Sequence, residues 1–111
     1  MQAVEDQLRA LMLAGLSGDA ASYRALLEAT AVRLRLYYAR RIGADHIALE
    51  DLVQETLIAV HTRRATYDRN RPFTAWLHAI ARYKLIDYMR SHRIHSAVPL
   101  EDAPEDAADA E

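Results

Sequence analysis

The chain has 111 residues, of which about half are apolar, a formal net charge of −2 and no cysteine. This length allows one domain with a modest core, and the lack of cysteine excludes disulfides and thiolate metal sites. Three glycines and three prolines, against abundant alanine, leucine, arginine and glutamate, favour helices over a sheet. No apolar run approaches the length of a membrane span, and the N-terminus is not that of a signal peptide.

Residues that end or cap helices define the first pair of helices. The first helix covers residues 2–15, and Gly15 belongs to the signal that ends it. The second is capped by Asp19 or Ser17 and ends before Gly43, because glycine is the usual residue just past a helix C-terminus.

A third helix, from about residue 48 to about residue 64, has two distinct faces. Its apolar stripe follows the i, i+3, i+4, i+7 pattern and consists of Leu49, Leu52, Val53, Thr56, Leu57 and Val60. The opposite face consists of Asp51, Gln54, Glu55, Ile58 and Thr62. Such a face is most often simply solvated. Ile58 among polar neighbours, however, is typical of a surface that a partner helix covers.

A loop of turn-forming residues, 66–72, separates the third helix from a fourth, which runs from Phe73 to about Arg93. The apolar stripe of the fourth helix is Phe73, Trp76, Leu77, Ile80, Ala81 and Tyr88. We expect Phe73 and Trp76 to anchor the helix in the core. Its other side carries His78, Arg82, Arg90 and Arg93, with Tyr83 near the edge.

Charge is distributed unevenly along the chain. Residues 1–60 carry six cations and eight acids, residues 61–95 carry eight cations and two acids, and residues 96–111 carry six acids and no cation. A basic block in a near-neutral chain is typical of a polyanion-binding surface, although a solvated face beside an unrelated acidic tail explains the composition equally well. We therefore expect an all-α fold, a compact bundle of about four helices with a disordered acidic C-terminal tail.

The loop before the fourth helix carries side chains suited to unpaired bases. Binding DNA without sequence preference needs only cations, whereas opening it needs a pocket and flat or amide-bearing side chains. Residues 67–71 offer the ring of Tyr67, the amide of Asn70 and two guanidinium groups.

Two motifs at this spacing resemble region 2 of bacterial sigma factors, in particular the small ECF (extracytoplasmic function) group. The first motif is Asp51-Leu52-Val53-Gln54-Glu55-Thr56-Leu57. The second is Arg71-Pro72-Phe73-Thr74-Ala75-Trp76-Leu77, continued by Ile80-Ala81-Arg82. The resemblance covers about residues 17–95. It implies that the third helix binds the clamp helices of the RNA polymerase β′ subunit, and that the loop and fourth helix recognise and melt the promoter −10 element.

The resemblance also implies roles for individual residues. The polymerase-binding residues are Asp51, Gln54, Glu55 and Ile58. The base-capture loop contains Arg69, Asn70 and Arg71. The stretch that reads the duplex edge contains Tyr83, Lys84 and Asp87. The phosphate contacts are Arg82, Arg90 and Arg93.

The sequence departs from the ECF pattern in two ways. Tyr83 stands where ECF members commonly have asparagine, and a phenol cannot make the bidentate contact of an amide with adenine, so the promoter preference is open. Nothing in the chain supplies region 4, the second helical domain of a complete factor. We therefore expect an isolated domain or a cleaved fragment, in which residues 1–96 form region 2 and residues 97–111 begin an acidic linker.

Other functions are less well supported. Five histidines lack the converging ligands of a metal site, and no Ser-His-Asp order, glycine-rich phosphate loop or pair of catalytic carboxylates stands out, so we expect neither an enzyme nor a cofactor. The alternative is a small helical adaptor or regulator whose basic helix binds an acidic protein. The resemblance implies core RNA polymerase, promoter DNA and an anti-sigma factor as partners, in the bacterial cytoplasm and without membrane insertion.

Overall fold

Helices make up most of the described chain. The structure, a computed structural model, describes residues 2–92 and contains α1 (Gln2–Leu16), α2 (Ala20–Ile42), α3 (Leu49–Thr62), the short 3₁₀ turn η1 (Arg64–Thr66) and α4 (Phe73–His92). These described residues form no strand. The predicted all-α bundle of four helices is confirmed. The expected acidic tail lies outside the described residues.

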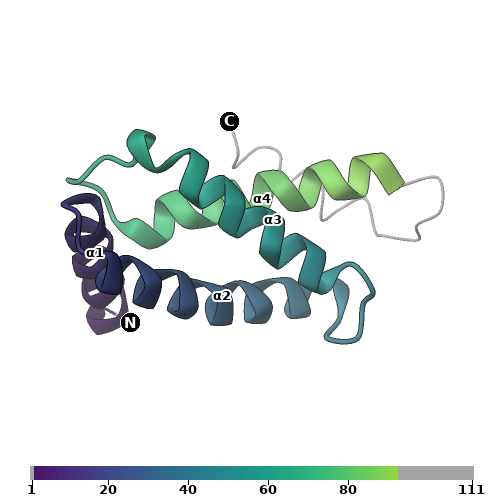
Figure 1. The fold of residues 1–111 in the computed structure, drawn as a ribbon. Coiled ribbons are helices and arrows are strands. Elements are labelled where there is room, and N and C mark those ends of the chain that lie inside the picture. The colour runs from purple at the N-terminus through teal and green to yellow at the C-terminus, as the bar shows by residue number, and fades with distance from the viewer. Residues whose placement is uncertain (1, 93–111) are drawn as a thin grey trace.

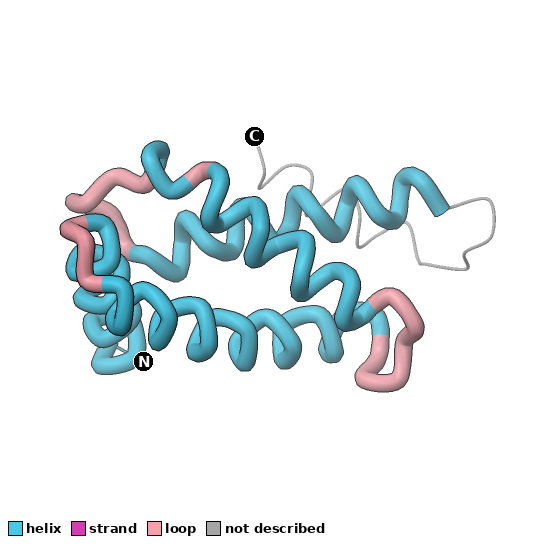
Figure 2. The backbone as a smooth tube through the Cα atoms, in the orientation of Figure 1, coloured by secondary structure: helices cyan, strands magenta, loops and turns pink. Residues whose placement is uncertain are grey.

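Three of the helices, α2, α3 and α4, run along the length of the molecule, and α1 packs across one end (Figure 1). The loops that follow α1 and α3 both lie at that end, whereas the loop between α2 and α3 lies at the opposite end (Figure 2). The extents of the molecule are 44 × 27 × 26 Å. The loop that precedes α4 is therefore a neighbour of α1, although about sixty residues separate them in sequence.

The ends of α2 follow the signals in the sequence. Asp19 is the N-cap, and its carboxylate accepts hydrogen bonds from the Ser22 backbone N–H at 3.3 Å and from the Ser22 hydroxyl at 2.8 Å. These bonds lower the pKa of Asp19. At the other end Gly43 has a φ of 101°, in the left-handed region, and its N–H donates to the Ala39 carbonyl at 2.9 Å. Asp19, rather than Ser17, is thus the cap.

Gly15 has a different role from the one predicted. The helix α1 continues through it to Leu16, so Gly15 does not end the helix. A Cβ at Gly15 would lie 2.7 Å from Cδ1 and 2.9 Å from Cβ of Tyr23, which is closer than packed carbons approach. Glycine is therefore needed here because it lets α1 lie close to α2. The turn itself is made at Gly18, with a φ of 107°.

The core is apolar apart from a few hydroxyl groups, and two of these join three helices. The Tyr38 hydroxyl on α2 lies 2.6 Å from Thr56 Oγ1 on α3 and donates to the Ala81 carbonyl on α4 at 3.0 Å. Tyr38 and Thr56 are both fully buried, and burial raises the pKa of the Tyr38 phenol. Thr56 Oγ1 also lies 2.7 Å from the Leu52 carbonyl, so these polar groups are all hydrogen-bonded.

The buried face of α4 is wider than the sequence predicted. The expected Phe73, Leu77, Ile80 and Ala81 are buried, but so are Leu85, Ile86 and Met89. Trp76 and Tyr88 are only half-buried. The buried positions shift around the helix axis because α4 contacts α1 at its start and α2 and α3 further along. No single 3.6-residue stripe describes such a helix.

Candidate functional site

The outer face of α3 presents the four residues that the sequence assigned to polymerase binding. Asp51, Gln54 and Glu55 are exposed, and Ile58 is 62% exposed. The fourteen-residue helix buries its other face, which includes Leu52, Val53 and Thr56. The motif is thus divided by helical periodicity: Thr56 holds the core together, and the acidic and amide side chains face outward. Their contact with polymerase stays a prediction.

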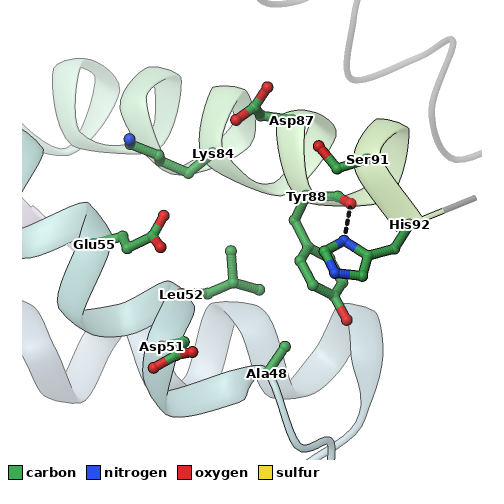
Figure 3. Close-up of a pocket in the computed structure, with 9 residues that line it drawn as sticks. All are labelled: Ala48, Asp51, Leu52, Glu55, Lys84, Asp87, Tyr88, Ser91 and His92. Carbon is green, nitrogen blue, oxygen red and sulfur yellow. Dashed lines mark hydrogen bonds between the residues drawn. The ribbon is translucent and has the colours of Figure 1, made fainter.

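Some of these outward-facing residues line a cleft between α3 and α4. The cleft has a volume of about 260 Å³ and is lined by Ala48, Asp51, Leu52, Glu55, Lys84, Asp87, Tyr88, Ser91 and His92. Figure 3 shows Lys84 on α4 lying opposite Glu55 on α3. The structure therefore brings together two sets that the sequence kept apart, since Asp51 and Glu55 were assigned to polymerase and Lys84 and Asp87 to DNA.

Aromatic contacts lie at one end of this cleft. The Tyr88 and His92 rings stack at 4.2 Å, and His92 Nδ1 lies 3.0 Å from the Tyr88 carbonyl oxygen (Figure 3). The ring of His46, in the loop before α3, meets Tyr88 edge-on at 5.9 Å. His46 Nδ1 also accepts the Ala48 backbone N–H at 3.0 Å. The C-terminal end of α4 is thereby packed against the start of α3.

Tyr67 does not offer its ring to bases, as the sequence suggested it could. It is 6% exposed, and its ring packs against Phe73 at 5.9 Å and Trp76 at 5.4 Å. Its hydroxyl donates to the Arg71 carbonyl at 2.6 Å. The expectation is wrong because the loop folds over its own aromatic residue, which joins the core beside Phe73 as an anchor.

The remaining loop residues, Arg69, Asn70 and Arg71, are all exposed. The Asn70 backbone N–H donates to the Asp68 carboxylate at 2.9 Å, which is a local turn of the kind that aspartate favours. Arg71 forms a loose ion pair with the same carboxylate at 3.9 Å. The tip of the loop thus presents two guanidinium groups and an amide to solvent, and their role in base capture stays a prediction.

Two residues of α1 hold this loop, and the sequence gave no sign of them. The Arg9 guanidinium donates to the Arg69 carbonyl through Nε at 3.1 Å and through a terminal nitrogen at 2.5 Å. The Glu5 carboxylate accepts the backbone N–H groups of Phe73 at 2.6 Å and Thr74 at 2.9 Å, and so caps α4 from another helix.

The environment of Glu5 favours its ionised form. Partial burial raises the pKa of this carboxyl, but the hydrogen bonds from Thr74 and Phe73 and the charge of Arg33 together outweigh burial and lower the pKa. No local signal could have identified Glu5, because its partners lie 68 and 69 residues away in sequence.

The predicted DNA-binding residues of α4 do not share one surface. Tyr83 is 54% exposed, and Asp87 and Arg90 are exposed near it, one and two turns further along. Lys84 instead lines the cleft toward α3. Arg82 lies one turn after His78, whose ring stacks on Tyr37 of α2. The charge of Arg82 contributes to lowering the pKa of His78. Arg93 lies outside the described residues.

Arg63 is a further candidate that the sequence did not single out. Its guanidinium lies 6.0 Å from the centre of the Tyr83 ring. This arrangement places a cation from the end of α3 beside the exposed Tyr83 ring of α4.

Neither metal nor membrane features emerge from the part of the chain that the structure describes. Residues 2–92 contain no group of three or more histidine, aspartate or glutamate side chains placed to hold a metal ion. No helix within the same range is both long and apolar enough to cross a membrane.

Comparison with known proteins decides the family. The sequence profile of sigma-70 region 2 matches residues 29–94, which include α3, the loop and α4. The chain belongs to the sigma-70 region 2 family. It is region 2 of an ECF-type sigma factor, a class of protein that takes part in transcription initiation.

Several curated relatives are ECF RNA polymerase sigma factors. SigF of Caulobacter vibrioides is 52% identical over 109 residues, which cover 98% of this chain and 61% of that protein. SigL of Mycobacterium tuberculosis is 40% identical over 92 residues, covering 78% of this chain and 51% of the relative. SigD of the same organism is 33% identical over 104 residues, which cover 90% of this chain and 49% of SigD. The chain thus spans half to three-fifths of these relatives. No solved structure matches it.

Proposed function

We propose that this domain binds the β′ clamp helices of RNA polymerase through α3, and recognises and melts the promoter −10 element through the loop of residues 66–72 and α4. The observation that carries the proposal is the pair of exposed surfaces on this family member. One is the α3 face of Asp51, Gln54, Glu55 and Ile58, and the other is the loop tip together with the exposed α4 residues Tyr83, Asp87 and Arg90. Residues 97–111 would begin a linker to further domains of a longer factor.

The α3 face has the composition of a polymerase contact. Three hydrogen-bonding side chains surround one large exposed apolar residue, Ile58. Nearby Glu50 is exposed too, but it already pairs with Arg35 at 2.7 Å and 3.2 Å, so it is not included in the contact. A mixed surface of this kind suits the polar rim and apolar centre of a protein interface.

The loop and α4 have the groups that base capture needs. Exposed Asn70 can read a base edge, and the neighbouring arginines can hold phosphates. Melting then follows from differential binding, because a protein that holds unstacked bases better than paired ones shifts the equilibrium toward open DNA. The rigid attachment of the loop to α1 through Arg9 and Glu5 lowers the cost of ordering it on binding.

The proposal places the domain in the bacterial cytoplasm with core polymerase. It also includes an anti-sigma factor among the expected partners of the domain.

Binding to a −10 non-template oligonucleotide and to a scrambled oligonucleotide of equal length tests the DNA half of the proposal. A sigma region 2 should prefer the −10 strand, and the preference should persist when salt is raised. Weak, salt-sensitive and equal binding to both oligonucleotides would instead support the adaptor alternative. Capture of core polymerase by the domain tests the other half independently.

A further inference from the structure

A basic groove lies between α2 and α4 and shares no residue with the cleft of Figure 3. It has a volume of about 390 Å³ and is lined by Arg33, Leu36, Tyr37, Arg40, Arg41 and His78. The Tyr37 ring stacks on His78 at 5.5 Å with the planes 16° apart, and the Arg41 guanidinium lies 4.7 Å from the centre of the same ring. These six lining residues include three arginines and no acid.

The electrostatics of the groove indicate concentrated positive charge. Burial and the charges of Arg33, Arg82 and Arg41 lower the pKa of His78. Arg33 Nε is buried and has no hydrogen-bond partner among the described residues. Glu5 is close enough for its pKa to be affected by Arg33, but its oxygens already accept the α4 amides. The groove is therefore suited to an anionic occupant.

An apolar strip beside the arginines distinguishes this groove from a simple phosphate site. Leu36 is 57% exposed and Val32, one turn earlier on α2, is 58% exposed. A sugar–phosphate backbone has no large apolar group that would pack against these side chains. An acidic peptide with apolar residues covers them and meets the arginines at the same time.

We propose that residues 96–111 of this chain bind in this groove. The segment has six acids and no cation, and its acids follow Val98 and Leu100. The charges are opposite to those of the groove, and the two apolar side chains match Leu36 and Val32. The contact is a property of this chain alone and does not depend on the proposed sigma function.

The position of the end of α4 allows this contact. Tyr88, near that end, touches His46, which follows Arg41 on α2 by only five residues. From His92 onward, the eight residues 93–100 can span about 26 Å at about 3.3 Å per residue. That reach is comparable to the shorter extents of the molecule, 27 and 26 Å. A short tether also keeps the acidic segment at high effective concentration around the groove.

A single spin label tests the contact on the full chain. Because the chain has no cysteine, Ala108→Cys creates one labelling site within the acidic segment. We expect strong paramagnetic broadening of the backbone amide signals of Leu36, Arg40 and His78. The amides of Gln54 and Ile58 on α3 should serve as a weakly affected reference. The broadening should decrease as salt is raised, because screening weakens the attraction.

Charge variants decide whether the arginines and acids are responsible. Arg40→Glu should reduce the broadening of the groove to the reference level, whereas Arg24→Glu, an exposed position on the same helix, should leave it unchanged. The combined change Glu101→Gln, Asp102→Asn, Glu105→Gln and Asp106→Asn should have the same effect as Arg40→Glu without altering any helix.

Three results would overturn the proposal. Broadening centred on Tyr83 and Arg90 would mean that the segment covers the outer face of α4. Broadening of the groove signals in chains that carry no spin label, when these chains are mixed with spin-labelled ones, would mean that a second copy occupies the groove. Uniform weak broadening, unaffected by Arg40→Glu, would mean that the segment makes no specific contact. None of these results bears on polymerase or promoter binding.

Discussion

The outer face of α3 and the loop before α4 form the two candidate contact surfaces, and they are held in place by different means. Asp51, Gln54, Glu55 and Ile58 face outward because the other side of their own helix is apolar and buried. The loop tip is placed by another helix, since Arg9 binds the Arg69 carbonyl and Glu5 caps the first amides of α4. The α3 face should therefore keep its geometry when other helices are changed, whereas the loop depends on α1. We expect mutations in α1 to affect the loop and its DNA binding without affecting the α3 face.

The largest effect is expected for Glu55→Arg. Reversing a charge at the centre of the proposed polymerase contact should cost about 2–5 kcal/mol and abolish capture of core polymerase. The far-ultraviolet circular dichroism spectrum should not change, because Glu55 is exposed. Glu28→Arg, the same change at an exposed position on α2, is the control and should bind normally. If Glu55→Arg binds core polymerase as well as the control, the assignment of the α3 face is wrong.

Asn70→Ala should affect the choice of sequence. Losing the amide should reduce discrimination between −10 and scrambled strands by about 1–3 kcal/mol, with little change in the salt dependence of binding. Fluorescence anisotropy with both oligonucleotides at several salt concentrations measures both quantities. Equal weakening on all sequences would remove Asn70 from base capture.

Glu5→Gln tests the dependence of the loop on α1. Without the carboxylate the Phe73 and Thr74 amides lose a charged acceptor, and the free energy of unfolding should fall by about 0.5–2 kcal/mol. Affinity for the −10 strand should fall as well, and core polymerase binding should remain. Gln7→Ala, an exposed change on the same helix, is the control. Loss of polymerase binding together with DNA binding would show that the two surfaces are not separable.

Arg90→Ala should weaken binding to every sequence alike. One lost phosphate contact should flatten the dependence of log affinity on log salt by about one unit. Arg24→Ala is the matched control, because Arg24 is an exposed arginine like Arg90 but lies on α2, outside the proposed DNA-binding surface. An unchanged salt slope would exclude Arg90 from the phosphate contacts.

The smallest effect concerns His78 and pH. Burial and the neighbouring arginines lower its pKa in the folded chain, so below about pH 6.5 the unfolded chain binds more protons than the folded one. The free energy of unfolding should therefore fall as the pH drops through this range. His78→Gln should reduce that fall, while Ala75→Gln on the same helix should not. Urea unfolding at about pH 7.5 and about pH 5.5 measures the difference. Parallel losses in all three proteins would rule out His78 as the cause.

The sequence by itself determined the features that depend on neighbouring residues in the chain. Helical periodicity assigned α3 its buried and exposed faces, Asp19 and Gly43 marked the ends of α2, and Phe73 was correctly assigned to the core. The two motifs also identified the family, because their residue types and spacing suffice for that.

Only the tertiary structure decided the features that depend on contacts between distant segments. Tyr67 is buried because the loop folds onto Phe73 and Trp76, and Glu5 caps α4 because α1 packs across the end of the bundle. Lys84 and Glu55 share a cleft on one side of α4, and His78 stacks on Tyr37 of α2 on another, because the crossing of the helices turns the two sides of α4 toward different neighbours. A residue pattern records the period of its own helix, but it does not record which helix lies opposite or at what angle.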